Sequence, residues 1–140
     1  MTTYEEVIEH VKIYGCLPEG FNQWDLVDGD GWTVAHNLAR HGNLPKGFNQ
    51  WELKSRRGKT VAHFAATYKH LPDDFNQWHL IDSNNRTVFE TMVFYYQGIP
   101  KWFKDWDLVI TDDGETCQEI YERIKNHGYF WRGRLTHGEG

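Results

Sequence analysis

The sequence predicts an all-α protein, a short solenoid of about four helix-turn-helix repeats of 27–29 residues with a capping N-terminal helix. The first observation is an exact word, Phe-Asn-Gln-Trp, at 21–24, 48–51 and 75–78, spaced by 27 residues each time. The second is a Leu-Pro pair that begins four residues before each Phe. The third is a Thr-containing element between these blocks, such as Gly-x-Thr-Val-Ala-His at 31–36 and 58–63. Self-similarity at a fixed period is the sequence signature of a stacked repeat architecture.

The repeats divide residues 1–140 into one domain of stacked units. A degenerate copy of the Leu-Pro block lies at 99–106, and the Thr-containing element returns at 85–90 and 114–119. These landmarks give units at about 3–27, 28–54, 55–81, 82–109 and 110–131, with a short C-terminal tail at 132–140. Solenoid units contact only their neighbours, so their contacts should recur from unit to unit.

Threonines mark the start of the principal helices. A threonine hydroxyl can accept from an exposed backbone N–H of the first turn, and a glutamate three residues later completes a capping box. The candidate capping boxes are Thr3–Glu6, Thr87–Glu90 and Thr116–Glu119. With the apolar spacing, these starts predict helices at roughly 4–14, 34–41, 61–69, 88–97 and 117–127.

A second, short helix is predicted over each Leu-Pro block, because Leu17, Phe21 and Trp24 have the i, i+4, i+7 spacing of a helical stripe. Proline suits the first turn of such a helix, since that position needs no N–H donor. The stripe places the repeated tryptophans in the core. Turns at 28–31, 55–58, 82–85 and 112–114 should close the units, with Gly or Asn where φ is positive.

These residues resemble the ankyrin repeat, whose signature is Gly-x-Thr-Pro-Leu-His-x-Ala. The resemblance is clearest at 31–42 and 58–66 and extends over about 28–128. The period is shorter than the usual 33, and Val34 stands where the family has its helix-opening proline. The chain is also similar to small phage-encoded ankyrin-like proteins. The resemblance implies a protein-binding array, and it implies a structural role for His36 and His63.

The histidines and amides are the next candidates for a site. His36 and His63 share their repeat position with Glu90 and Glu119, which favours a hydrogen bond at the helix start over a metal site. No metal or cofactor is expected, because compact ligand spacing is absent from the sequence. The repeated Asn-Gln pairs have two interpretations. A ladder of amides bonded to backbone between units is favoured over a binding stripe.

The turn tips are the predicted partner-binding surface, because they vary while the framework stays constant. In ankyrin-like proteins such tips line the binding face. The first tip is acidic and aromatic, the second basic and the third mainly polar. Trp32 is the expected anchor, since Trp and Arg are enriched in interface hot spots. The predicted contact residues are Asp28, Asp30, Trp32, Arg56, Arg57, Lys59, Asn84 and Arg86.

We therefore expect a protein–protein interaction module and not an enzyme, since no nucleophile motif or phosphate loop is present. The expected partner is a protein of mixed charge, and the phage resemblance suggests an inhibitor or adaptor acting on a host or defence protein. The alternatives are nucleic-acid binding through the basic turn 54–59 and a small enzyme without a recognisable motif. A net charge of −5 disfavours nucleic acid. The sequence predicts a cytoplasmic protein, in the host cytoplasm if phage-encoded, without membrane contact.

Overall fold

Residues 3–96 and 99–127 are described in a computed structural model, and this part of the chain contains five α-helices and no β-strand. The prediction of an all-α protein is confirmed. The helices are α1 (Tyr4–Tyr14), α2 (Val34–His41), α3 (Val61–Thr67), α4 (Val88–Tyr96) and α5 (Cys117–His127). α3 ends two residues before the predicted 69, because Lys69 has a left-handed backbone with φ 66. The predicted last residue of α4, position 97, and the tail at 132–140 lie outside the described residues.

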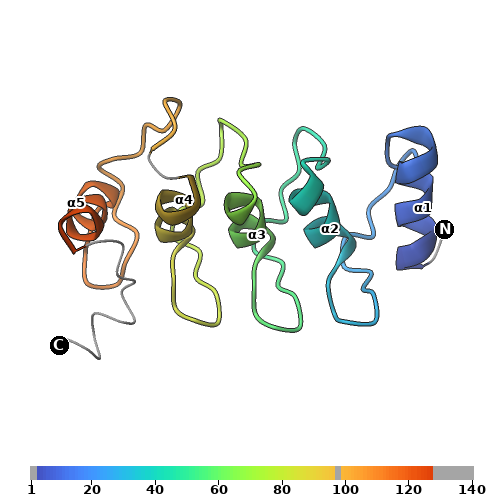
Figure 1. The fold of residues 1–140 in the computed structure, drawn as a ribbon, viewed down its shortest axis with the longest axis horizontal. Coiled ribbons are helices and arrows are strands. Elements are labelled where there is room, and N and C mark those ends of the chain that lie inside the picture. Colours follow the sequence, from blue (N-terminus) through green and yellow to red (C-terminus); the bar gives the residue numbers. More distant parts are fainter. Residues whose placement is uncertain (1–2, 97–98, 128–140) are drawn as a thin grey trace.

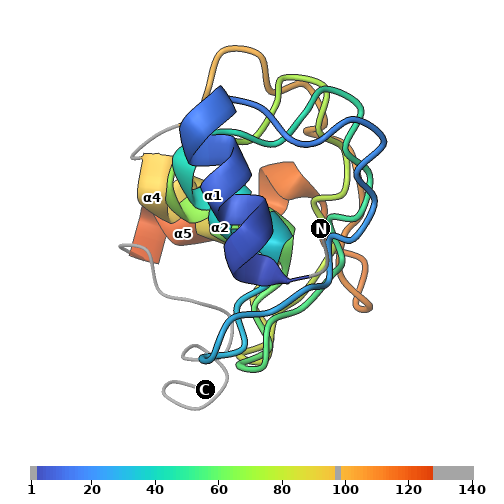
Figure 2. The same cartoon turned by 90° about the vertical axis from the view of Figure 1, so that its right-hand side faces the viewer.

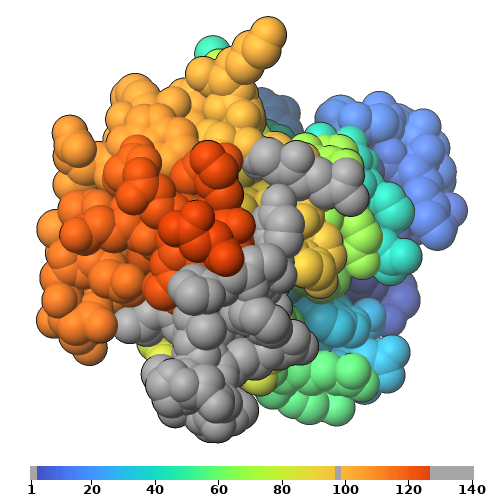
Figure 3. Space-filling view, turned by 60° about the vertical axis from the view of Figure 1, so that its left-hand side comes forward, coloured from blue at the N-terminus to red at the C-terminus, as the bar shows by residue number. Residues whose placement is uncertain are grey.

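The helices lie side by side in chain order (Figure 1). Within the described ranges, each helix contacts only the helices next to it in sequence. The view down the row shows the helices gathered on one side and the connecting segments on the other (Figure 2). The turns that precede α2 to α5 project at one edge of the row, and the Leu-Pro segments project at the opposite edge (Figure 1). On the surface, the segments follow one another in sequence order towards the C-terminal end (Figure 3).

The predicted threonine caps are confirmed. The hydroxyls of Thr33 and Thr60 accept from the backbone N–H groups of His36 and His63, at 3.1 and 3.0 Å. The capping boxes of α1, α4 and α5 also form. Their threonine hydroxyls accept from the third helical N–H, and the glutamate side chains accept from the threonine N–H groups of residues 3, 87 and 116. Each helix therefore starts where the sequence places it.

The second helix of each unit is absent, so that prediction is wrong. In each Leu-Pro segment the N–H of the Phe donates to the proline carbonyl three residues earlier, at 3.1 Å, which closes a turn and not a helix. Gly20 and Gly47 have φ values of 73 and 86 just before the Phe. This left-handed backbone cannot continue a right-handed helix. The i, i+4, i+7 stripe nonetheless faces the interior, because two consecutive turns bring the same three positions together.

Alternating Phe and Trp rings of the Leu-Pro segments form one continuous stack through the row. Neighbouring rings meet edge to face, with centroids 4.7–5.2 Å apart. Such edge-to-face pairs add stability beyond burial itself. Trp51 and Trp78 are buried in the middle of the row, whereas Trp24 and Trp106 are half-buried towards its ends. The stack contains Phe21, Trp24, Phe48, Trp51, Phe75, Trp78, Phe103 and Trp106.

His36 and His63 join successive units, and the structural interpretation of both is confirmed. The Nε2 atom of His36 lies 2.7 Å from the carbonyl oxygen of Lys59, and that of His63 lies 2.7 Å from the carbonyl of Arg86. A carbonyl only accepts, so Nε2 carries the proton and Nδ1 accepts from the threonine hydroxyl of the cap. Burial lowers the pKa of both histidines, and the bond to the carbonyl only partly opposes this effect. Each neutral imidazole therefore links the capping threonine of its own helix to a backbone carbonyl in the turn of the next unit.

Candidate partner-binding edge

Each turn that precedes a helix is held by a side chain at its first position. The carboxylate Oδ1 of Asp82 accepts from the N–H groups of Asn84 and Arg86, at 2.9 and 3.1 Å. Asp28 holds the first turn in the same way. Ser55 holds the second through its hydroxyl. Single antiparallel bridges close the turns, and Gly31, Gly58, Asn85 and Gly114 have the predicted positive φ. Sequence reasoning found these glycines but missed the first-position oxygen, although an Asp, Ser or Thr at that position is a known turn signal.

The first three tips are fastened to one another. The N–H of Arg56 donates to the carbonyl of Gly31 at 3.2 Å, and the N–H of Ser83 donates to the carbonyl of Gly58 at 3.1 Å. A Cβ atom on Gly58 would lie 2.5 Å from the Cβ of Ser83, so the tips approach too closely for a side chain there. The tips therefore form a connected edge and do not move as independent fingers.

Several of the predicted partner-contact residues instead make contacts within the chain at this edge. Trp32, the expected anchor, is half-buried against Phe64 of the next unit, with ring centroids 4.8 Å apart. Trp32 is therefore less exposed than its place at a turn tip suggested, while its role as an anchor stays a prediction. The cover was not predicted, because the repeat position of Phe64 is held by Asn37, Thr91 and Ile120 in the other units. Asp28 holds its own turn. The guanidinium of Arg56 lies 3.5 Å from the carbonyl of Gly29, while its side chain stays exposed.

Lys59 and Arg86 are also less available than predicted. The Nζ of Lys59 lies 2.8 Å from Oδ2 of Asp82, whose own side chain is fully buried. Burial alone would raise the pKa of Asp82, but the bond from Lys59, the neighbouring His63 and the bond from the Arg86 N–H together hold it below its usual value. Arg86 is half-buried and has interactions within the chain. The basic turn 54–59 is therefore partly neutralised, which weakens the nucleic-acid alternative.

Three predicted residues share the apex position of successive tips. Asp30, Arg57 and Asn84 are spaced by 27 residues, and all three are exposed. Within the described part of the chain their side chains make no hydrogen bond or ion pair, whereas the residues on either side hold the turn. An acid, a guanidinium and an amide thus follow one another along the edge without a role in the fold.

The Asn-Gln ladder is absent from the structure, so its prediction is wrong. Asn22, Asn49 and Asn76 are exposed, and Gln50 and Gln77 are only half-buried. No side-chain hydrogen bond of any of the repeated amides occurs among residues 3–96 and 99–127. The amides lie between the Phe and Trp of each segment in sequence, but none of them is buried. The repeated amide side chains thus have no hydrogen-bond partner in the part of the chain that the structure describes.

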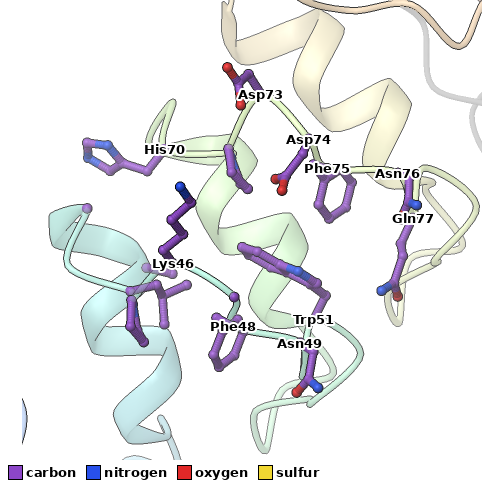
Figure 4. Close-up of a pocket in the computed structure, with 16 residues that line it drawn as sticks. Lys46, Phe48, Asn49, Trp51, His70, Asp73, Asp74, Phe75, Asn76 and Gln77 are labelled. Atoms are coloured by element: carbon purple, nitrogen blue, oxygen red, sulfur yellow. The ribbon is translucent and has the colours of Figure 1, made fainter.

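A groove of about 540 Å³ lies between the Leu-Pro segments of the second and third units. Phe48, Trp51 and Phe75 contribute its aromatic wall, while Lys46 and Asp74 come from opposite segments (Figure 4). The repeated amides of both segments also line the groove, as do His70 and Asp73. Its lining is therefore aromatic at the base and of mixed charge at the rim.

Other chemistry in the described residues is sparse. Burial raises the pKa of the Cys117 thiol to about 12, with a smaller contribution from Asp105, so the thiolate is strongly disfavoured. Cys16 is exposed. Residues 3–96 and 99–127 contain no group of three or more His, Cys, Asp or Glu placed to hold a metal ion. Within the same ranges, none of the helices has the length and apolar character to cross a membrane.

No family of known proteins, no curated protein and no solved structure matches the chain. The structure itself shows an all-α protein whose five helices, within the described residues, lie side by side in chain order (Figure 1).

Proposed function

We propose that the chain is an ankyrin-like solenoid that works as a protein–protein interaction module and contacts its partner through the apex residues of the turn edge. One observation carries the proposal: the side chains of Asp30, Arg57 and Asn84 are exposed, differ in chemistry and make no hydrogen bond or ion pair among residues 3–96 and 99–127. The framework around them is fixed by buried caps and inter-unit hydrogen bonds. A rigid scaffold that presents variable exposed side chains is the usual arrangement of a binding surface.

The partner that fits this edge is a protein of mixed charge. Asp30 would meet a cation, and Arg57 would meet a carboxylate, where a guanidinium can bond two oxygens at once. Neighbouring charges of opposite sign set the choice of partner and the association rate more than the affinity. The resemblance to phage proteins supports an inhibitor or adaptor role in a host cytoplasm as part of the same proposal.

Affinity purification from the native host, followed by mass spectrometry, tests the proposal. The baits are the wild-type chain, the apex variant Arg57→Ala with Asn84→Ala, and Lys125→Ala, an exposed charge removed from α5 as the matched control. We expect wild type and control to enrich the same protein and the apex variant to lose it. Equal enrichment by the apex variant, or no protein enriched by wild type over empty resin, would contradict the proposal.

A further inference from the structure

Each Leu-Pro segment carries a charged side chain at one repeat position, directly after the proline, and the third and fourth segments add an exposed charge of the same sign at Asp74 and Lys104. The residues directly after the proline are Glu19, Lys46, Asp73 and Lys101, so the sign alternates along the row. All four side chains are exposed. The ion pairs present among the described residues, Lys59–Asp82 and Arg123–Glu115, involve none of them. The row of charges therefore has no partner within the described chain.

An alternating row of four charges is complementary to itself when it is reversed. Two copies placed edge to edge and antiparallel would oppose Glu19 to Lys101 of the second copy, and Lys46 to Asp73 of the second copy. By symmetry, Asp73 and Lys101 of the first copy face Lys46 and Glu19 of the second copy. A parallel arrangement would instead oppose like charges at each position. Self-complementarity under a twofold rotation is the requirement for an isologous dimer, which is the commonest symmetric assembly.

The groove lies at the centre of this antiparallel arrangement. The twofold axis would pass between the units of Lys46 and Asp73, which are the units that enclose the groove. Figure 4 shows Lys46 and Asp73 on segments that flank the groove, with Asn49 and Asn76 on the same two segments. A carboxamide both donates and accepts hydrogen bonds, so Asn49 of one copy and Asn76 of the other can bond each other. The arrangement thus gives partners to charges and amides that lack them in one copy.

We propose that the Leu-Pro edge is a homodimer interface, on which a second copy of this chain docks antiparallel along the row Glu19, Lys46, Asp73 and Lys101. The interface lies at the opposite edge from the turn tips (Figure 1), so both copies keep their apex residues exposed. This dimer is independent of the partner proposed for the turn edge. Its failure would leave that proposal intact, because the two surfaces share no residue.

Sedimentation velocity at low and high salt tests the interface with the full chain as its own probe. We expect a reversible dimer whose dissociation constant rises with salt, because exposed charge pairs are screened. Lys46→Asp places two carboxylates opposite each other at both symmetry-related contacts with Asp73, so it should raise the dissociation constant of the dimer at least about tenfold. Lys46→Asp combined with Asp73→Lys restores opposite signs across the twofold axis and should recover the dimer. Arg57→Asp, a charge reversal at the turn edge, should leave it unchanged.

The double variant, in which Lys46 and Asp73 exchange their charges, distinguishes a homodimer from another molecule bound in the groove. A peptide or a different protein bound to Lys46 and Asp73 would meet both reversed charges in the double variant, so its binding would not recover. Circular dichroism should show that each variant keeps its helices, since the substituted side chains are exposed and make no ion pair among the described residues. A wild-type chain that stays monomeric up to about 1 mM would overturn the proposal. A dimer indifferent to Lys46→Asp, or a double variant that fails to recover it, would overturn it equally.

Discussion

Substitution of His63 tests how much the hydrogen bonds of one inter-unit histidine contribute to the free energy of unfolding. His63→Ala removes the bond from Nε2 to the carbonyl of Arg86, at 2.7 Å, and the bond between Nδ1 and the hydroxyl of Thr60, at 2.6 Å. Two lost hydrogen bonds cost about 2 kcal/mol, and the buried Thr60 hydroxyl, whose proton loses its acceptor, costs a further 1–3 kcal/mol, roughly. The carbonyl of Arg86 still accepts from the N–H of Asp82. We therefore expect the free energy of unfolding to fall by about 3–5 kcal/mol.

Urea unfolding followed by tryptophan fluorescence and by circular dichroism measures the loss at pH 7.5. His70→Ala is the matched control, because the His70 side chain is exposed and forms no hydrogen bond among the described residues, and the backbone N–H that donates to the carbonyl of Ala65 is kept in alanine. Its free energy of unfolding should stay within about 0.5 kcal/mol of wild type. A loss below about 1 kcal/mol for His63→Ala would refute the reasoning, since that figure is the worth of one ordinary hydrogen bond without any orphaned group.

Two further measurements test the turns and the histidines. Gly47→Ala and Gly58→Ala both force alanine into a positive φ, but only Gly58 faces a neighbour, the Cβ of Ser83 at 2.5 Å. Gly58→Ala should cost about 2–4 kcal/mol and Gly47→Ala about 1–2 kcal/mol in urea unfolding, and equal losses would show that the tips are not in close contact. The pKa values of His36 and His63 are lowered in the folded chain, so the unfolded chain binds protons first as pH falls. The free energy of unfolding should therefore be constant above pH ~7 and decline below pH ~6.5, whereas stability that rises on acidification would contradict the buried neutral rings.

The sequence allowed prediction of every feature that depends on contacts within one helix start. Thr33 and Thr60 could be assigned as caps because the threonine hydroxyl and the backbone N–H from which it accepts lie within one turn of helix. The positive φ of Gly31 followed from the same local chemistry. Local rules of this kind need only the identity of nearby residues, which the sequence provides directly.

Features that depend on two units at once could not be predicted in the same way. Trp32 was expected at an exposed tip, but Phe64 of the next unit covers it at a position that does not repeat. The Leu-Pro segments were expected to be helical because turns and a helix place the same apolar positions on one side. The left-handed backbone of Gly20 and Gly47 distinguishes the two structures in the first two segments, and the N–H of each Phe, which donates to the proline carbonyl three residues earlier, marks the turn in all four. The free amides of the Asn-Gln pairs likewise become evident only once the backbone is placed.

The bonds between neighbouring tips determine how the protein can change its length. Each of them joins residues at a constant separation: 23 residues for the histidine bonds and 25 for the backbone bonds of Arg56 and Ser83. Duplication or deletion of one entire 27-residue unit in the middle of the row preserves every one of these separations. An insertion of any other length within the unit changes at least one of these separations. The row is therefore open to growth by gene duplication in whole units, and each added unit would contribute one more apex residue that is free to diverge.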